Sequence, residues 1–203
     1  MISDKFMVNS EPERMAQARY ATENFAWKAK LDKRNTLRLT LLVEETLGMV
    51  KNLVDEFYGQ MWFESNENAC ELHLQATADM NNDRKQELLS VSSSGRNAAA
   101  KGFMAKIGEV FSLAMHGFGR SVDLYGQEML QYGVVHDGAA MAGMTPIWSL
   151  QTYRADLAQA RDNNVGADEA WDELEKSIVA KLADDVVVGV KGDRIELVIL
   201  KKF

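Results

Sequence analysis

The sequence has a single cysteine, Cys70, and two prolines among its 203 residues. A lone thiol excludes an intramolecular disulfide and a cysteine-rich metal site. One free thiol is typical of proteins in a reducing compartment, so we expect a cytoplasmic protein. The sequence also has no apolar run of signal-peptide or membrane-spanning length, and it therefore predicts no membrane partner.

Basic runs are also missing, because no stretch of Lys and Arg exceeds two residues and the net charge is −7. This excludes the basic patch that nucleic-acid-binding proteins usually show, so we expect no nucleic-acid partner. The three histidines, His73, His116 and His136, are scattered, with no helical spacing of four among them. The sequence therefore predicts no zinc site.

The composition, with 46% hydrophobic and 26% charged residues, is typical of a globular protein with a sizeable core. Residues 36–54 predict its central helix, because apolar side chains recur there at helical spacing. These side chains are Leu39, Val43, Leu47, Val50 and Val54. The opposite side of the helix is not simply polar and carries Leu41, Glu45, Met49 and Asn52. A helix that is apolar nearly all round usually lies between two layers.

Glu45 is then a carboxylate on a mostly covered helix face. Burying an unpaired charge is costly, so a buried Glu45 needs a hydrogen-bond donor, a cation or a ligand. The alternative is a half-exposed glutamate at the rim of a core helix. The sequence leaves both interpretations open.

The first thirty residues predict a short strand and a helix. The strand covers residues 5–8, and the helix runs from Pro12 to about Lys30 with Ser10 as its N-cap. The larger apolar side chains of this helix include Tyr20, Phe25 and Trp27.

The next segment predicts a hairpin after the central helix. Residues 31–35 break the helical pattern before that helix, and Gly59 is a candidate for its C-terminal cap. A strand is predicted at residues 61–64. A second strand is predicted at 70–77, where apolar and polar residues alternate as they do in a half-buried strand.

Residues 84–168 differ in character and predict a helical insertion, or lid. Residues 98–115 fit a helix, whereas 126–144 are rich in Gly, Met and Ala without a clear period. Such a stretch fits a mobile cover or a surface that packs on a partner, and filling of a core by its methionines is the alternative. Residues 145–150 lead into a short helix at 151–161.

The end of the chain predicts a helix at 167–183 and two strands at 184–190 and 195–199. We see no internal repeat and no long linker, so residues 1–203 are expected to form one domain. The predicted fold class is α+β: a two-layer sandwich with a mixed, mostly antiparallel sheet, helices on one face and a helical insertion.

This element order, with the helix LRLTLLVEETLGMV, resembles the GHKL ATPases, which share the HSP90-like Bergerat fold. The chain is most similar to anti-sigma-factor serine kinases and to the ATP-binding domains of histidine kinases. The resemblance covers residues 5–80 and 167–203 and not the middle.

The resemblance implies a catalytic role for Glu45, because the family helix carries a Glu that activates the attacking water or hydroxyl. Four residues later the family has an Asn that holds Mg²⁺. Met49 stands at that position here, and a thioether is a poor ligand for Mg²⁺. Asn52, about two turns beyond Glu45, is the amide that would have to substitute. We therefore expect no metal ligand at position 49.

The resemblance also implies a nucleotide site. Asp79 follows the strand at 70–77 where the family has the Asp that reads the adenine amino group, but Asn81 replaces the family's Gly. Gly95, Arg96 and Lys101 in the insertion are candidate phosphate donors.

The function that follows is an ATP- or nucleotide-binding regulatory protein that acts on a protein partner, with family-type catalysis lost. ATP with Mg²⁺ is the cofactor that the family implies, an active enzyme would be an ATPase or a protein serine kinase, and a homodimer fits the family. An alternative is a degenerate fold that binds a protein or a small ligand instead of ATP.

A third interpretation is an unrelated hydrolase. A triad is conceivable from residues 92–94, His116 or His136, and Asp123, but no Gly-x-Ser-x-Gly motif occurs.

Overall fold

One six-stranded antiparallel sheet organises the protein, and its strand order is β1-β2-β3-β6-β5-β4. The structure, a computed structural model, describes residues 1–54, 56–66, 68–78, 145–161, 165–191 and 194–203. The strands are β1 (Phe6–Asn9), β2 (Phe57–Ser65), β3 (Ala69–Ala78), β4 (Thr145–Ser149), β5 (Asp185–Lys191) and β6 (Arg194–Lys202). The C-terminal hairpin β5–β6 joins the middle hairpin β2–β3 through the β3–β6 ladder, as predicted.

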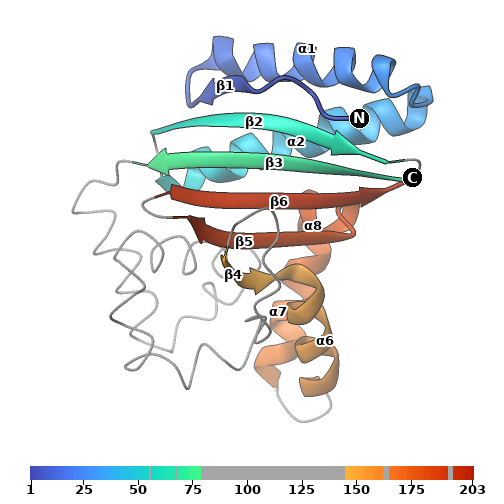
Figure 1. Ribbon diagram of the computed structural model, residues 1–203. Helices are drawn as coiled ribbons and strands as arrows, with labels where there is room; N and C mark the ends of the chain where they lie inside the picture. The colour runs from blue at the N-terminus through green and yellow to red at the C-terminus, as the bar shows by residue number, and fades with distance from the viewer. Residues whose placement is uncertain (55, 67, 79–144, 162–164, 192–193) are drawn as a thin grey trace.

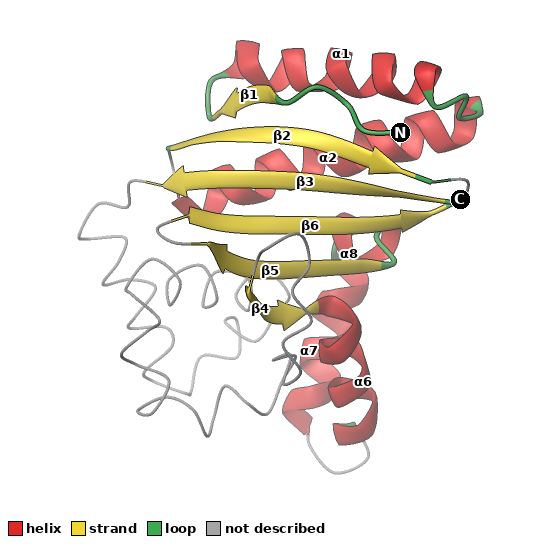
Figure 2. Cartoon of the chain, viewed as in Figure 1, coloured by secondary structure: helices red, strands yellow, loops and turns green. Residues whose placement is uncertain are grey.

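The described helices cover one face of this sheet (Figure 1). They are α1 (Pro12–Lys28), α2 (Lys33–Val54), α6 (Leu150–Ala160), α7 (Val165–Lys176) and α8 (Ile178–Leu182). Figure 2 shows the resulting two layers, with α2 running behind the strands. The predicted α+β class is confirmed, and the described strands pair antiparallel throughout rather than as a mixed sheet.

The core lies between the helices and the sheet. The predicted stripe of α2 is buried from Leu39 to Val50, with Leu39, Val43 and Val50 fully covered. Alternate residues of β2 meet it, and Phe63 stacks on Phe25 of α1 with ring centroids 4.6 Å apart. Each such side chain contributes roughly 1.5–3 kcal/mol through burial, so this layer holds the fold together.

The start of α1 differs from the prediction. Glu11, not Ser10, occupies the N-cap, and its side chain makes no capping hydrogen bond. The Ser10 hydroxyl instead accepts a hydrogen bond from the Phe57 N–H at 3.1 Å, which ties the chain to the start of β2. Two of the aromatics counted among the apolar residues of α1, Tyr20 and Trp27, are 73% and 78% exposed.

Helix α2 begins earlier than the sequence pattern indicated. The Asp32 carboxylate accepts a hydrogen bond from the Asn35 N–H at 2.8 Å, as an N-cap residue does, so the helix starts at Lys33. Residues 31–35 therefore break the helical pattern for a shorter distance than expected.

Gly59 was predicted to cap α2, and this was wrong. It lies inside β2, opposite Ala76 of β3. A Cβ atom at position 59 would lie 2.6 Å from the backbone oxygen of Gln75, so the close approach of the two strands requires glycine. Strand β2 is consequently longer than the predicted 61–64.

Part of the predicted insertion belongs to the sheet. Residues 145–149 form β4, which pairs with β5 at the sheet edge, and the sequence analysis had not predicted this strand. Helix α6 follows directly, with the Ser149 hydroxyl accepting a hydrogen bond from the Thr152 N–H. The predicted helix at 98–115 and the Met-rich stretch 126–144 lie outside the described residues.

The predicted helix at 167–183 is two helices. Ser177 separates them, and its hydroxyl caps α8 by accepting a hydrogen bond from the Ala180 N–H at 3.2 Å. The break lets Val179 and Ala180 turn into the core, while Ile178 is 39% exposed.

Candidate functional site

Glu45 lies half-buried on α2, on the side of the helix opposite Val43. Its neighbour Glu44 points to α1 and forms an ion pair with Arg19, with 3.5 Å between Oε1 and Nη1. Within the described parts of the chain, Glu45 itself makes no ion pair or hydrogen bond. The structure thus favours the rim position over a fully buried charge.

Gly48 leaves the surface of α2 open next to Glu45. A Cβ atom at position 48 would meet no described atom within 4 Å, so packing does not explain this glycine. Glycine inside a helix costs about 1 kcal/mol relative to alanine. Asn52 lies exposed one turn further on the same side. Along this side of α2 lie the carboxylate of Glu45, the backbone of Gly48 without a side chain, and the amide of Asn52.

Met49, one turn beyond Glu45 on the same side of α2, is 4% exposed and belongs to the core. The position at which the resemblance expects a Mg²⁺-binding amide thus faces apolar side chains. A thioether among them does not bind Mg²⁺, which needs oxygen ligands.

The other predicted nucleotide contacts lie outside the described residues. They are Asp79, Asn81, Gly95, Arg96 and Lys101. The same holds for the triad candidates at 92–94 and for His116, His136 and Asp123. Of the predicted site residues, the structure therefore brings Glu45 and Asn52 onto one helix side.

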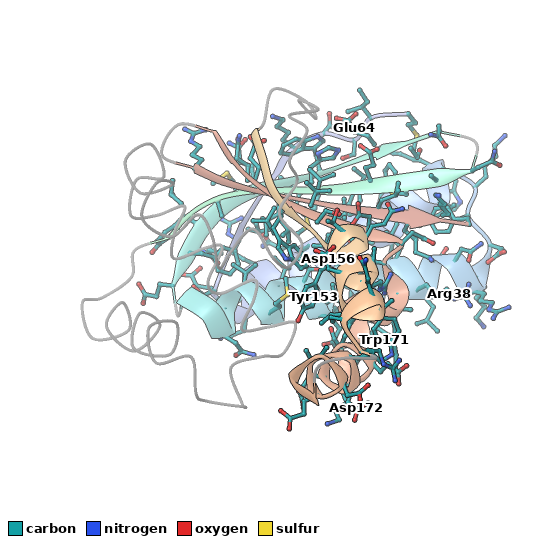
Figure 3. The ribbon with its side chains drawn as sticks, turned by 90° about the horizontal axis from the view of Figure 1, so that it is seen from below. Arg38, Glu64, Tyr153, Asp156, Trp171 and Asp172 are labelled. Atoms are coloured by element: carbon teal, nitrogen blue, oxygen red, sulfur yellow. The ribbon has the colours of Figure 1, made fainter. Side chains whose placement is uncertain are left out.

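A second polar cluster lies on the face of the sheet opposite to the described helices. Trp62 of β2 stacks on His73 of β3, with ring centroids 4.8 Å apart and planes 7° from parallel. The Lys5 ammonium lies 4.1 Å from the centre of the Trp62 ring. Figure 3 shows Glu64 of this cluster on the side of the sheet away from α1 and α2.

Two carboxylates border the His73 ring. Its Nε2 atom lies 3.3 Å from Glu71 Oε2 and 3.8 Å from Glu64 Oε1. The Trp62 indole N–H donates a hydrogen bond of 3.1 Å to Glu64. Burial lowers the pKa of His73, and it outweighs the opposing effect of Glu64 and Glu71.

The sequence analysis missed this cluster because it compared only helical spacings of histidines. Glu71 and His73 are two apart in a predicted strand, which places them on one sheet face. Their pairing with Glu64 and Trp62 needs the β2–β3 register, which the short turn after Ser65 sets.

None of the three comparisons with known proteins gave a match, whether with family models, curated proteins or solved structures. No helix among the described residues has the length and apolar character needed to cross a membrane. The arguments for function therefore come from the chain itself.

Proposed function

We propose that this chain is a nucleotide-binding regulatory protein similar to the GHKL anti-sigma-factor kinases, with their catalytic activity lost. The observation that carries the proposal is the face of α2 with Glu45 beside the open Gly48 position. The connectivity supports it, because β1, two helices and a hairpin precede the insertion and a helix and hairpin end the chain. Asp79 follows directly on β3, where the resemblance expects the adenine contact.

The proposed loss of catalysis rests on Met49. Phosphoryl transfer depends on positioning and on charge stabilisation by a metal that bridges the phosphates. With Met49 in the core, α2 has no oxygen at the metal-binding position. Nucleotide binding then depends on protein groups alone, and its affinity should not change when Mg²⁺ is removed. The implied partner is a regulatory protein in the cytoplasm.

The test is calorimetric titration of the full chain with ATP and ADP, each with and without Mg²⁺. We expect saturable binding that Glu45→Gln weakens at least about tenfold, which is 1.4 kcal/mol. Asp79→Asn should weaken adenine nucleotides more than GTP.

Glu44→Gln is the matched control, because Glu44 is the adjacent carboxylate and pairs with α1 instead. It should leave affinity unchanged. The absence of both binding heat and a thermal shift at millimolar nucleotide would reject the proposal. If Glu45→Gln and Glu44→Gln changed the affinity equally, Glu45 would not be a specific nucleotide contact.

A second candidate is a protein-interaction role, and the exposed aromatics of α1 favour it. Tyr20 and Trp27 are seven positions apart, about two turns, and therefore lie on one side of the helix. Tyr and Trp are enriched at protein interfaces. If this side forms a homodimer, sedimentation should show a concentration-dependent dimer that Trp27→Ser abolishes. A monomer at every concentration would reject the homodimer.

A further inference from the structure

The cluster of Glu64, Glu71 and His73 has the composition of a metal site. Each residue offers one ligand atom, and the three atoms lie within 4.8 Å of one another. Glu64 belongs to β2, while Glu71 and His73 belong to β3, so two paired strands fix the backbone beneath all three. A site on paired strands is held more rigidly than a site on loops.

The two carboxylates oppose each other. Glu64 and Glu71 are direct partners in the β2–β3 register, and like charges directly opposite across a ladder destabilise a sheet. In the described part of the chain, neither carboxylate has a Lys or Arg within ion-pair distance. A cation bound between the two carboxylates would offset their repulsion.

His73 supplies the independent observation. Its side chain is 4% exposed, and its Nε2 atom is buried without a properly aligned hydrogen bond. That atom points to the carboxylate oxygens of Glu71 and Glu64. A buried ring nitrogen that has no well-aligned hydrogen bond is rare, because buried polar groups normally make one.

We propose that Glu64, Glu71 and His73 bind one divalent transition-metal ion of the Zn²⁺ class. Zinc bonds of about 2.0–2.2 Å place tetrahedral ligand atoms about 3.4 Å apart. His73 and Glu71 already have this separation at 3.3 Å, and Glu64 Oε1 lies 3.8 Å from the same Nε2 atom. An imidazole among the ligands favours Zn²⁺, Co²⁺ or Ni²⁺ over Mg²⁺ and Ca²⁺.

The site is reachable from solvent and leaves room for a further ligand. The side chains of Glu64 and Glu71 are 40% and 37% exposed, so an ion can enter between them and keep a water in the fourth position. Trp62 is a positioning residue, because it stacks on the His73 ring and donates a hydrogen bond to Glu64.

The experiment is calorimetric titration of the chelator-treated full chain with ZnCl₂, repeated with MgCl₂. We expect one saturable Zn²⁺ site and no Mg²⁺ binding there. Glu64→Gln and Glu71→Gln should each weaken Zn²⁺ at least about tenfold, because each removes an anionic ligand. Glu173→Gln, which changes an exposed carboxylate on α7, is the matched control and should leave the affinity unchanged.

Substitution of buried His73 risks unfolding, so Co²⁺ provides a readout on the unmodified chain. Tetrahedral Co²⁺ gives intense visible absorption, and its titration should saturate at one equivalent and be displaced by Zn²⁺. Absence of saturable binding, or affinities unchanged in both glutamine variants, would overturn the proposal. Glu45→Gln should not affect Zn²⁺ binding. The proposed metal site and the proposed nucleotide site are therefore tested independently of each other.

Discussion

The two faces of the sheet use the same strands for different purposes. Along β2, the residues that face the helices, such as Phe57 and Phe63, are fully buried in the large apolar core. The intervening residues include Trp62 and Glu64. They share this face of the sheet with His73 of β3 and with the small apolar pair Val187 and Val198 of β5 and β6. The helix-covered face stabilises the fold through its buried apolar surface area, whereas the other face brings specific polar groups together.

This contrast shows how strand alternation separates folding from chemistry. Residues on the helix-covered face can be replaced only by apolar side chains of similar shape. The polar face contains arrangements that lower the stability of the sheet and that apolar packing does not explain. The opposed pair of Glu64 and Glu71 is one such cost. A local rule broken without an evident structural gain is a reason to look for a ligand.

The largest predicted change in the free energy of unfolding comes from truncating a buried side chain on the helix-covered face. Phe63→Ala should lower the free energy of unfolding by about 3–5 kcal/mol, because the fully buried ring stacks on Phe25. Urea unfolding followed by circular dichroism measures this. Tyr58→Ala on the other face of β2, where the ring is 60% exposed, is the control and should change it by about 0.5 kcal/mol at most. Similar losses in both variants would erase the distinction between the faces.

A second prediction concerns the thiol on the helix-covered face. Burial, and secondarily the charge of Glu71, raise the pKa of Cys70 to about 12 from its ordinary value of 9.0. The thiolate population at pH 8 should therefore fall on the order of a thousandfold. A disulfide reagent such as Ellman's should react with the native chain only as fast as it unfolds. Rapid reaction of the native chain, compared with the urea-unfolded control, would contradict this placement of β3.

Two glycine substitutions should act with opposite sign. Gly59→Ala places a methyl group against the backbone of β3, so the strands must separate, at about 1–3 kcal/mol. Gly48→Ala adds a methyl group in open space on α2 and should stabilise the chain by about 1 kcal/mol. Thermal unfolding of both variants beside the wild type provides the comparison. A destabilised Gly48→Ala would mean that the α2 face is already occupied.

The smallest effect is expected at Asp184, which precedes β5 beside the end of β6. Burial raises the pKa of Asp184, but the Lys202 N–H and the Lys201 ammonium, 2.9 Å away, outweigh it and hold the pKa below 3.8. This stabilisation is present above pH 3.8 and is lost as the pH falls through the folded-state value. It should be below about 1 kcal/mol, because the group is partly solvated.

Asp184→Asn should therefore lower the urea midpoint at pH 6, and the difference from wild type should shrink as the pH falls below 3.8. A difference that stays constant over that range would assign the effect to packing instead of charge.

Much of the sheet was predictable, because β3 alternates clearly and the end hairpin has strong strand residues. The errors have local causes. Gly59 fits both a helix cap and a close strand approach, and only the partner strand decides between them. Ser177 interrupts an apolar stripe that continues across it, so periodicity alone did not find the break.

The candidate sites were predictable to different degrees. Glu45 stands out on a helix that is largely apolar all round, and Met49 follows it by helical spacing. The Glu64–Glu71–His73 cluster depends on the register between two strands, which a single sequence does not display.

The β3–β6 ladder also determines whether the two halves of the sheet can fold independently. Gln75 donates a hydrogen bond to Glu196, 121 positions later, at the seam where the two halves of the sheet meet. Neither half can cover its inner edge alone, so both must form together in one cooperative unit. A cut in the chain between β3 and β4 should therefore yield two fragments that recognise each other, and mixing them should restore the sheet without a covalent link.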